Sequence, residues 1–243
     1  CIRDSGSFYR EVARTADCAP EDMVAGDLVL YNNQPGTVWG AEGEFVSAPR
    51  LDDLACVFAC TEGFLTAQER DMVPVLCVFD NEEIGSETKQ GAASVFLPET
   101  LAAISEALGL SAADHRALLA DSMMLSCDNG HARHPNHPEL ADTNEAPVLN
   151  GGVVVKHSPR YATDGVSSAV FTELCRRAEV PVQHYANRPD QMGGATLGNI
   201  ADTKLPIPTV DIGMAQLAMH SCFETMGSRD VEAFVRAVRA CYE

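Results

Sequence analysis

Short apolar runs alternate with longer segments of helical periodicity along most of this chain. Five runs predict strands, and the first two are apolar enough to be buried on both faces: MVPVLCVFD, MMLSCDNG, GVVVKHS, PVQHYAN and IPTVDIG. Five segments predict helices: LDDLACVFACTEGFLTAQ, LPETLAAISEALG, SAADHRALLADS, DGVSSAVFTELCRRAEV and RDVEAFVRAVRACYE. This alternation predicts an α/β fold, a three-layer sandwich with a mainly parallel central sheet and helices on both faces.

The first part of the chain follows a different pattern. Its opening residues are polar, GDLVLYNNQPGTVWG predicts a strand ending in an Asn-Gln-Pro-Gly turn, and GEFVSAP predicts a short strand. The sequence contains no internal repeat, low-complexity tract or convincing linker. Since 243 residues with 46% apolar side chains suit one large domain, we expect residues 1–243 to form a single domain.

The net charge of the chain argues against some classes of binding partner. A formal net charge of −18 argues against binding to nucleic acid or an anionic membrane, since both require a basic face. The same excess of acids permits a site for divalent cations. The nine cysteines are an odd number, and several lie inside apolar patterns, which indicates reduced core thiols. With no membrane-length apolar run and no signal peptide in the sequence, we expect a cytoplasmic protein.

Acids and histidines follow the predicted strands at their carboxyl ends. They are Asp80, Glu82 and Glu83 after one strand, Asp128, His131 and His134 after another, and His220 after a third. Because ligands bind outside the carboxyl ends of strands in such sheets, we expect these side chains to converge, together with the acid pair Asp52 and Asp53. A two-metal hydrolase needs this combination, with one carboxylate shared between the ions and another acting as base on a water.

Each of these features also has a structural explanation. An acid pair in the first turn of a helix, such as Asp52 and Asp53, is usually a capping device. A lone histidine such as His220 is more often a hydrogen-bonded structural residue, and HARHPNHPE could be a loop held by its prolines. MGGATLG lacks the Lys-Ser/Thr ending of a phosphate loop, so we expect its glycines to admit a substrate. For Glu82 and Glu83, which directly follow a predicted buried strand, a purely structural explanation is the weakest.

Six landmarks in order carry a family resemblance over nearly the whole chain. They are QPGTVWGAEGEFVSAPRLDDL, DNEEIGS, DNGHARHPNHPE, VVVKHSPRYATDG, NRPDQMGGATLGNI and VDIGMAQLAMHSCFE. With these motifs the chain resembles the catalytic portion of the aspartyl aminopeptidases, a family of two-zinc metallopeptidases that form tetrahedral assemblies. The resemblance implies a zinc-peptidase-like fold. The family's assembly is not carried over to this chain, because the dimerising insert is mostly absent here, and the homo-oligomer expected for it rests on uncovered apolar surface.

The resemblance also implies a role for each acid of the site. Asp52 would bridge two divalent ions, zinc in the first instance with cobalt or manganese as alternatives. Glu83 and His220 would complete the protein ligands of one ion, and Asp128 would hold the other. Glu82 would be the general base that takes a proton from the attacking water.

The substrates implied are peptides with an N-terminal Asp or Glu. Recognition of that acidic side chain needs a cation, for which Lys156 is the candidate, with His131 and His134 as supporting donors. A solvated lysine at a strand end is the alternative for Lys156. Two further functions stay open, a two-metal aminopeptidase of broader specificity and a non-catalytic assembly or binding module.

Two departures from the family pattern bear on activity. Asp53 stands where the family usually has Asn, which adds negative charge beside the metals. The His-Thr-Asp-type segment that supplies a metal ligand is missing upstream, and the first histidine is His115. We therefore expect an incomplete, carboxyl-terminal catalytic portion in which 1–45 borders the family's inserted dimerisation domain. Such a chain should show weak or no activity alone and expose surface that favours self-association.

Overall fold

The computed structural model describes residues 5–68, 72–191 and 193–243, which form two compact units divided after Asn33. The first unit contains helix α1 (Ser5–Thr15) and the turn η1 (Pro20–Asp22). We expected only a polar segment here, but Glu11 and Arg14 lie one helical turn apart, and Arg14 Nε donates to Glu11 Oε2 at 3.0 Å. The assignment of 1–45 to the border of a dimerisation domain stays a prediction.

The strand predicted in GDLVLYNN is wrong. Residues 27–33 are extended but pair with no strand among the residues that the structure describes, and most of their side chains are exposed. An apolar run forms a strand only when a neighbouring strand accepts its backbone hydrogen bonds. The short strand expected in GEFVSAP is confirmed as β2 (Phe45–Ala48), and it forms a hairpin with β1 (Thr37–Trp39), which lies after the Asn-Gln-Pro-Gly turn.

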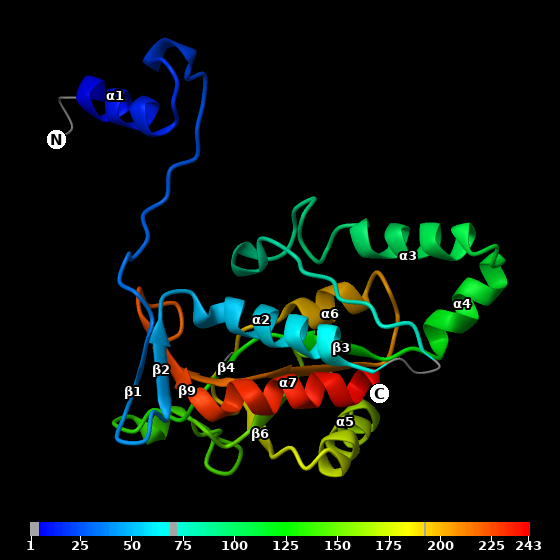
Figure 1. The fold of residues 1–243 in the computed structure, drawn as a ribbon. Coiled ribbons are helices and arrows are strands. Elements are labelled where there is room, and N and C mark those ends of the chain that lie inside the picture. Colours follow the sequence, from blue (N-terminus) through cyan, green and yellow to red (C-terminus); the bar gives the residue numbers. More distant parts are fainter. Residues whose placement is uncertain (1–4, 69–71, 192) are drawn as a thin grey trace. The chain divides into compact units, whose positions relative to one another are not determined.

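Two sheets form the centre of the second unit (Figure 1). The four-stranded sheet has the order β3 (Met124–Cys127), β7 (Thr209–Gly213), β5 (Val153–His157) and β6 (Val182–Ala186). The five-stranded sheet has the order β1, β2, β9 (Glu224–Gly227), β8 (Ala215–Leu217) and β4 (Gly130–His131). Four of the predicted strands are thereby confirmed.

The strand directions are more mixed than the sequence indicated. The pairs β3–β7, β5–β6 and β4–β8 are parallel, but β5 runs antiparallel to β7, and the other pairs of the five-stranded sheet are antiparallel. The short loop between β8 and β9 allows only an antiparallel pair. Hydrogen bonds from Asp128 N to Ile212 O and from Gly130 N to Met214 O, both 3.0 Å, connect the β3–β7 ladder with β4–β8. Asp128 therefore lies where the two sheets meet.

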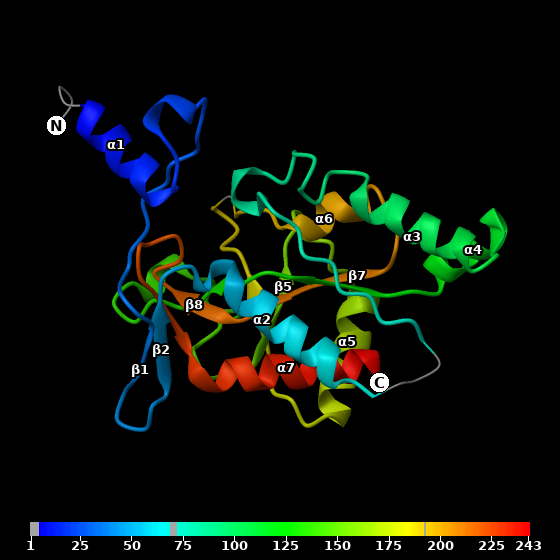
Figure 2. The same cartoon turned by 45° about the horizontal axis from the view of Figure 1, so that its top comes forward.

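The helices cover both faces of the four-stranded sheet, as predicted. One face packs against α2 (Leu51–Thr66), α5 (Gly165–Arg177) and α7 (Ser228–Tyr242), and α2 and α7 lie side by side in both views (Figures 1 and 2). The short helix α6 (Leu197–Asp202) packs against β3 and β7 through their opposite face. Helices α3 (Phe96–Ala107) and α4 (Ala112–Ala120) contribute to a second, smaller core. Two short turns complete the unit, η2 (Glu82–Ile84) and η3 (Pro138–Leu140).

The strand predicted in MVPVLCVFD is also wrong. Residues 73–79 are extended but belong to neither sheet, and Val73, Val75 and Val78 are exposed. Leu76, Cys77 and Phe79 still pack partly against the two cores. The run is apolar enough for a buried strand, but no described strand lies alongside it to complete a ladder.

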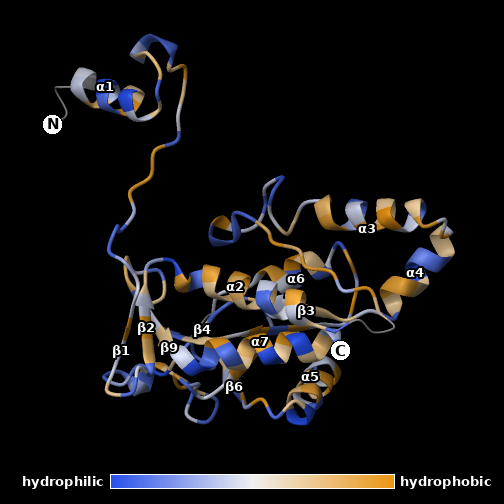
Figure 3. Ribbon diagram, viewed as in Figure 1, coloured by the Kyte–Doolittle hydropathy of each residue, from blue (hydrophilic) through white to orange (hydrophobic). Residues whose placement is uncertain are grey.

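Apolar side chains also face outward on α2. Figure 3 shows hydrophobic residues along the helix, and Leu54, Phe58 and Leu65 are more than half exposed. Val73, Val75 and Val78 are exposed as well, and exposed apolar side chains of this kind favour association with another chain. None of the helices in the described ranges is both long and apolar enough to span a bilayer.

A substitution at the crossing of α2 and α7 tests this packing. A Cβ atom on Gly63 would lie 2.7 Å from Val238 Cγ1 and 3.1 Å from Val235 O. We expect Gly63→Ala to lower the free energy of unfolding by about 1–2 kcal/mol, because overpacking outweighs the gain in helix propensity. Urea unfolding followed by far-UV circular dichroism measures this, and Gly26→Ala, with no atom within 4 Å of the added Cβ, is the control. A more stable Gly63→Ala protein would contradict the packing described.

Candidate metal centre

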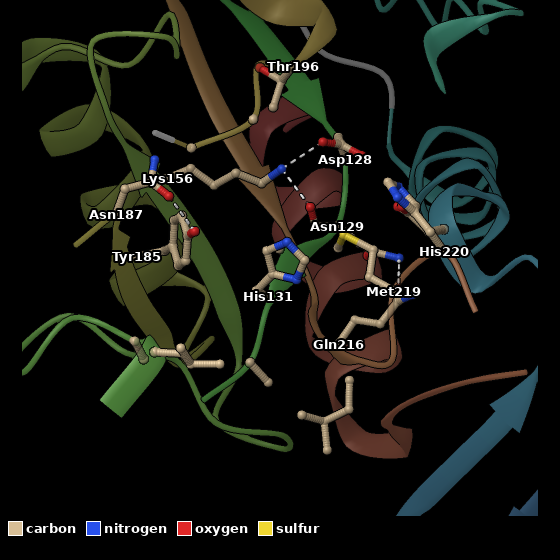
Figure 4. Close-up of a pocket in the computed structure, with 18 of the residues that line it drawn as sticks. Asp128, Asn129, His131, Lys156, Tyr185, Asn187, Thr196, Gln216, Met219 and His220 are labelled. Atoms are coloured by element: carbon tan, nitrogen blue, oxygen red, sulfur yellow. Dashed lines mark hydrogen bonds and ion pairs between the residues drawn. The ribbon is translucent and has the colours of Figure 1, made fainter. Parts of the chain in front are cut away.

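One pocket of about 460 Å³ is lined by all eight residues that were given a role in the expected site, whereas Asp80, expected to converge with them, does not line it. The eight are Asp52, Glu82, Glu83, Asp128, His131, His134, Lys156 and His220. They come from segments far apart in the sequence: the start of α2, η2, the β3–β4 connection, β4 and the loop after it, β5 and the β8–β9 loop. Figure 4 shows Asp128, His131, Lys156 and His220 around this pocket. Their convergence is as expected, while their individual roles stay predictions.

Asp52, Glu83 and His220 form the first group of candidate metal ligands. One ligand atom from each lies within 4.8 Å of the others. His220 Nε2 is 3.2 Å from Asp52 Oδ2 and 3.0 Å from Glu83 Oε2. The other oxygen of Asp52, Oδ1, is buried and has no hydrogen-bond partner among the described residues. A buried carboxylate oxygen left without a partner is costly, so this atom indicates a missing positive group.

A tight turn presents Glu82 and Glu83 to the pocket. Asn81 and Gly85 flank η2 with φ values of 62° and 102°, in the left-handed region, and Gly85 meets this requirement without steric cost. Ser86 N donates to Asn81 O at 2.9 Å and closes the turn. The acids can therefore leave the extended segment 73–79 and face Asp52 within a few residues.

Asp52, Asp53 and Asp128 form a second group whose ligand atoms also lie within 4.8 Å of one another. Asp52 belongs to both groups, which is the arrangement that a bridging carboxylate needs. Asp53 Oδ1 accepts a hydrogen bond from Asn129 N at 3.2 Å. Lys156 Nζ donates to Asp128 Oδ2 at 2.8 Å and compensates part of the negative charge.

The electrostatics of the cluster fit a divalent cation. Burial, followed by repulsion from Asp128 and Glu83, raises the pKa of Asp52 to about 8. Burial and Asp128 raise the pKa of Glu82 to about 7 in the same way. Carboxyl groups held protonated near neutral pH become ionised when a cation binds between them. Carboxylate and imidazole donors suit zinc, with manganese or cobalt as alternatives.

The three residues proposed for substrate binding have different surroundings. Lys156 is 2% exposed, and its ammonium donates to Asp128 and, at 2.7 Å, to Asn129 O (Figure 4). Burial alone would lower the pKa of Lys156, but the Asp128 charge outweighs burial and raises it, so the ammonium stays charged. Burial and nearby His220 and Lys156 lower the pKa of His131, which favours a neutral imidazole. His134 is exposed at the rim and accepts from Asn136 N at 3.2 Å.

Sequence reasoning missed several polar residues that support the site. Asn129 is buried, and its side chain donates to Leu51 O at 2.9 Å and to Gln216 Oε1 at 2.8 Å. Tyr185 donates to Asn187 Oδ1 at 2.6 Å in the wall beside Lys156 (Figure 4). The one signal in the sequence was the position of Asn129 directly after Asp128. The contacts of Tyr185, Asn187 and Gln216 depend on the tertiary fold and leave no local pattern.

Comparisons with known proteins identify the family of the chain. A family model described as aminopeptidase I zinc metalloprotease (M18) matches residues 3–242. A probable M18 family aminopeptidase 2 of Mycobacterium leprae is 40% identical over 240 residues, which are 98% of this chain and 56% of that protein. The crystal structure of yeast aminopeptidase 1 has a TM-score of 0.86 and 32% identity, and covers 98% of this chain and 55% of that one.

A second solved structure describes an assembly. The S. cerevisiae mApe1 dodecamer has a TM-score of 0.84 and 32% identity, with 99% of this chain and 54% of that chain covered. The chain thus spans little more than half the length of the relatives it matches. The family model covers nearly every residue of the chain. The chain belongs to the M18 family of zinc metalloproteases, the family of aminopeptidase I.

Proposed function

We propose that this chain carries the metal centre of an aminopeptidase that removes N-terminal Asp or Glu from peptides. One observation carries the proposal: the buried carboxylate of Asp52 belongs to two groups of candidate ligands at once, with Glu82 in the same pocket. A two-ion site with an adjacent base is suited to hydrolysis of an amide bond. Membership of the M18 family supports the same reaction.

In this proposal the acids divide into metal ligands and a base. Asp52, Glu83 and His220 would hold one divalent ion, and Asp52 and Asp128 would hold a second. Zinc bound there would supply Lewis-acid chemistry, polarising the scissile carbonyl and making water more acidic. The Glu82 carboxylate would take the proton of the attacking water and return it to the leaving amine.

Selectivity for an acidic N-terminal residue is the finer part of the proposal. Lys156 places a permanent positive charge on the pocket wall, and His131 and His134 add donors near it. Since Lys156 already pairs with Asp128, a substrate carboxylate would have to share the ammonium. Hydrolysis of Asp-, Glu- and Leu-p-nitroanilide by the zinc-loaded protein tests the selectivity. Equal kcat/KM for all three favours the broader-specificity alternative, and no hydrolysis with no zinc uptake favours a non-catalytic module.

The rate of this chain alone should be low. Its second group of ligands is entirely carboxylate, without the imidazole that the family resemblance implies, and the chain spans about half of its relatives. Catalytic zinc normally has three protein ligands including nitrogen or sulfur donors. Long incubations at high protein concentration, with and without EDTA, therefore provide the appropriate assay.

We also propose that the chain self-associates. Leu54, Phe58 and Leu65 on α2 and the three exposed valines of 73–78 present apolar surface, and a relative of the same fold is described as a dodecamer. Light scattering over a range of concentrations measures the mass. Phe58→Glu should shift the protein toward the monomer, whereas a monomer at every concentration would contradict the proposal.

Zinc binding is expected to release protons near neutral pH. In the metal-free protein the pKa of Asp52, about 8, keeps its carboxyl mostly protonated at pH 7, and a bound ion requires it ionised. We expect roughly one proton per first zinc at pH 7 and progressively fewer toward pH 9. Calorimetric titrations in buffers of different ionisation enthalpy measure the number. Zinc-binding enthalpies that are independent of the buffer at pH 7 would contradict the protonated state.

The raised pKa of Asp52 also makes the stability of the metal-free protein depend on pH. The folded-state pKa of Asp52 lies above its unfolded value of 3.8, so its contribution to stability is complete below about pH 4 and disappears as the pH rises through about 8. The melting temperature in EDTA should therefore fall between pH 6 and pH 9. Saturating zinc should remove most of this dependence, because the ion replaces the proton.

A further inference from the structure

Glu224, the first residue of β9, makes two hydrogen bonds that no motif indicated. Its side chain is 2% exposed. Oε1 accepts from the backbone N–H of His220 at 2.7 Å, and Oε2 accepts from the backbone N–H of Asp52 at 3.0 Å. One buried carboxylate thus connects the backbones of two candidate metal ligands that are far apart in the sequence.

Both backbones that Glu224 contacts depart from regular geometry. His220 has a φ of 65°, a left-handed conformation that side chains other than glycine rarely adopt, in the loop between β8 and β9. Asp52 has a φ of −87° and a ψ of 111°, which are not helical, although it lies in the first turn of α2. Neither conformation is maintained by its own secondary-structure element, so an external acceptor is needed to fix each N–H.

Glu224 is not itself a third candidate ligand. It belongs to neither group of potential ligands found among the described residues. Each of its oxygens already accepts a hydrogen bond from a backbone N–H, and hydrogen bonds from N–H groups to a carboxylate are strong. Its negative charge contributes to the raised pKa of Asp52, so it lies close behind the ligands.

We infer that Glu224 is a positioning residue that holds Asp52 and His220 together so that both reach the same ion. The inference rests on the proposed metal centre and adds a residue to it. The side chains of Asp52 and His220 approach to 3.2 Å only if the start of α2 and the β8–β9 loop keep a fixed separation, and Glu224 is the group that bridges them. Mutation of a group that orients a metal ligand typically lowers the affinity for the metal by about 10–100-fold.

The chain offers a matched control in Asp230. This carboxylate is 1% exposed and also accepts two backbone N–H groups, from Asn150 at 2.7 Å and from Gly152 at 2.8 Å. It connects the start of α7 to the loop before β5 and lines no part of the pocket. A substitution at Asp230 therefore removes similar chemistry from the fold without touching the candidate ligands.

The test is a titration of the purified chain with Co²⁺, followed by visible absorption, whose intensity and band positions report the geometry of the ligands. Glu224→Asp keeps the charge but shortens the side chain, so it cannot reach both N–H groups, and Glu224→Gln keeps the length but offers only one acceptor. We expect both variants to weaken Co²⁺ binding about 10–100-fold and to change the spectrum. Asp230→Asn should bind Co²⁺ with the affinity and spectrum of the unsubstituted chain.

Several results would overturn the inference. If Glu224→Asp binds Co²⁺ as the unsubstituted chain does, Glu224 acts only through its charge or not at all. If Asp230→Asn weakens binding equally, the effect is one of general stability. A second measurement needs no variant: amide exchange by NMR should show the N–H groups of Asp52 and His220 protected, and rapid exchange at both would refute the role. Failure of the unsubstituted chain to bind Co²⁺ would instead refute the metal centre itself.

Discussion

Replacing Asp52 with alanine is expected to remove zinc binding from this chain. Asp52 is the one residue shared by both groups of candidate ligands, so its loss leaves Glu83 with His220 on one side and Asp53 with Asp128 on the other. Two protein ligands are too few to hold zinc tightly. We expect the dissociation constant to rise at least about 100-fold, beyond what loss of a residue that only orients a ligand would cause. Competition with a chromophoric chelator measures the change.

The same variant separates loss of metal from loss of fold. Asp52 is buried with a raised pKa, so at pH 8 its removal relieves a charge that the metal-free protein is forced to bury. The metal-free Asp52→Ala protein should therefore melt no lower than the metal-free parent at that pH. Glu106→Ala, an exposed acid on α3, is the control for removing a carboxylate elsewhere. Zinc affinity unchanged in Asp52→Ala would show that the ion binds at another place.

Glu82→Gln is expected to separate catalysis from metal binding. Glu82 lies in the pocket but in neither group of candidate ligands, so zinc affinity should change by only a few-fold. The amide cannot accept a proton, and loss of a general base typically lowers kcat by about 100- to 10,000-fold. Hydrolysis of Asp-p-nitroanilide by zinc-saturated protein measures the effect. Glu87→Gln, an exposed acid from the same loop, should retain the parental rate.

Two outcomes would count against the role of Glu82. If the variant hydrolyses substrate at the parental rate, the base is another group. If it loses zinc together with activity, Glu82 is a ligand rather than a base, and the assignment of roles within the Glu82–Glu83 pair must be exchanged. The pH dependence gives an independent check, because protonation of the base should produce an acid limb in kcat/KM, which the variant lacks.

Much of the fold was predictable from local signals. The cap residues Ser111 and Asp164 each form a capping box at the start of α4 and α5, where the sequence placed those helices. The apolar runs of β5 and β7 are buried strands. The run of β3, which its composition indicated to be buried on both faces, is only partly buried apart from Ser126. Polar residues directly after such runs marked the pocket, since the ends of neighbouring strands come together at one edge of a sheet.

The errors have a common physical cause. Leu30 and Val75 lie in runs as apolar as those of the true strands, but strand formation depends on a partner, which a single segment does not specify. The direction of β5 relative to β7 likewise depends on how the chain returns to the sheet. Glu224 was missed because a buried carboxylate bonded to two distant backbone groups leaves no local pattern, and only the folded chain places it behind Asp52 and His220.

The most direct test of the metal centre is the anomalous scattering of a zinc-soaked crystal of this chain, measured on both sides of the zinc absorption edge. The proposal predicts a peak at about 2.0–2.2 Å from ligand atoms of Asp52, Glu83 and His220, with a second ion on the Asp128 side sharing Asp52. Zinc bound only at exposed histidines such as His134 and His137, with no peak at Asp52, would contradict the proposed centre and the function built on it.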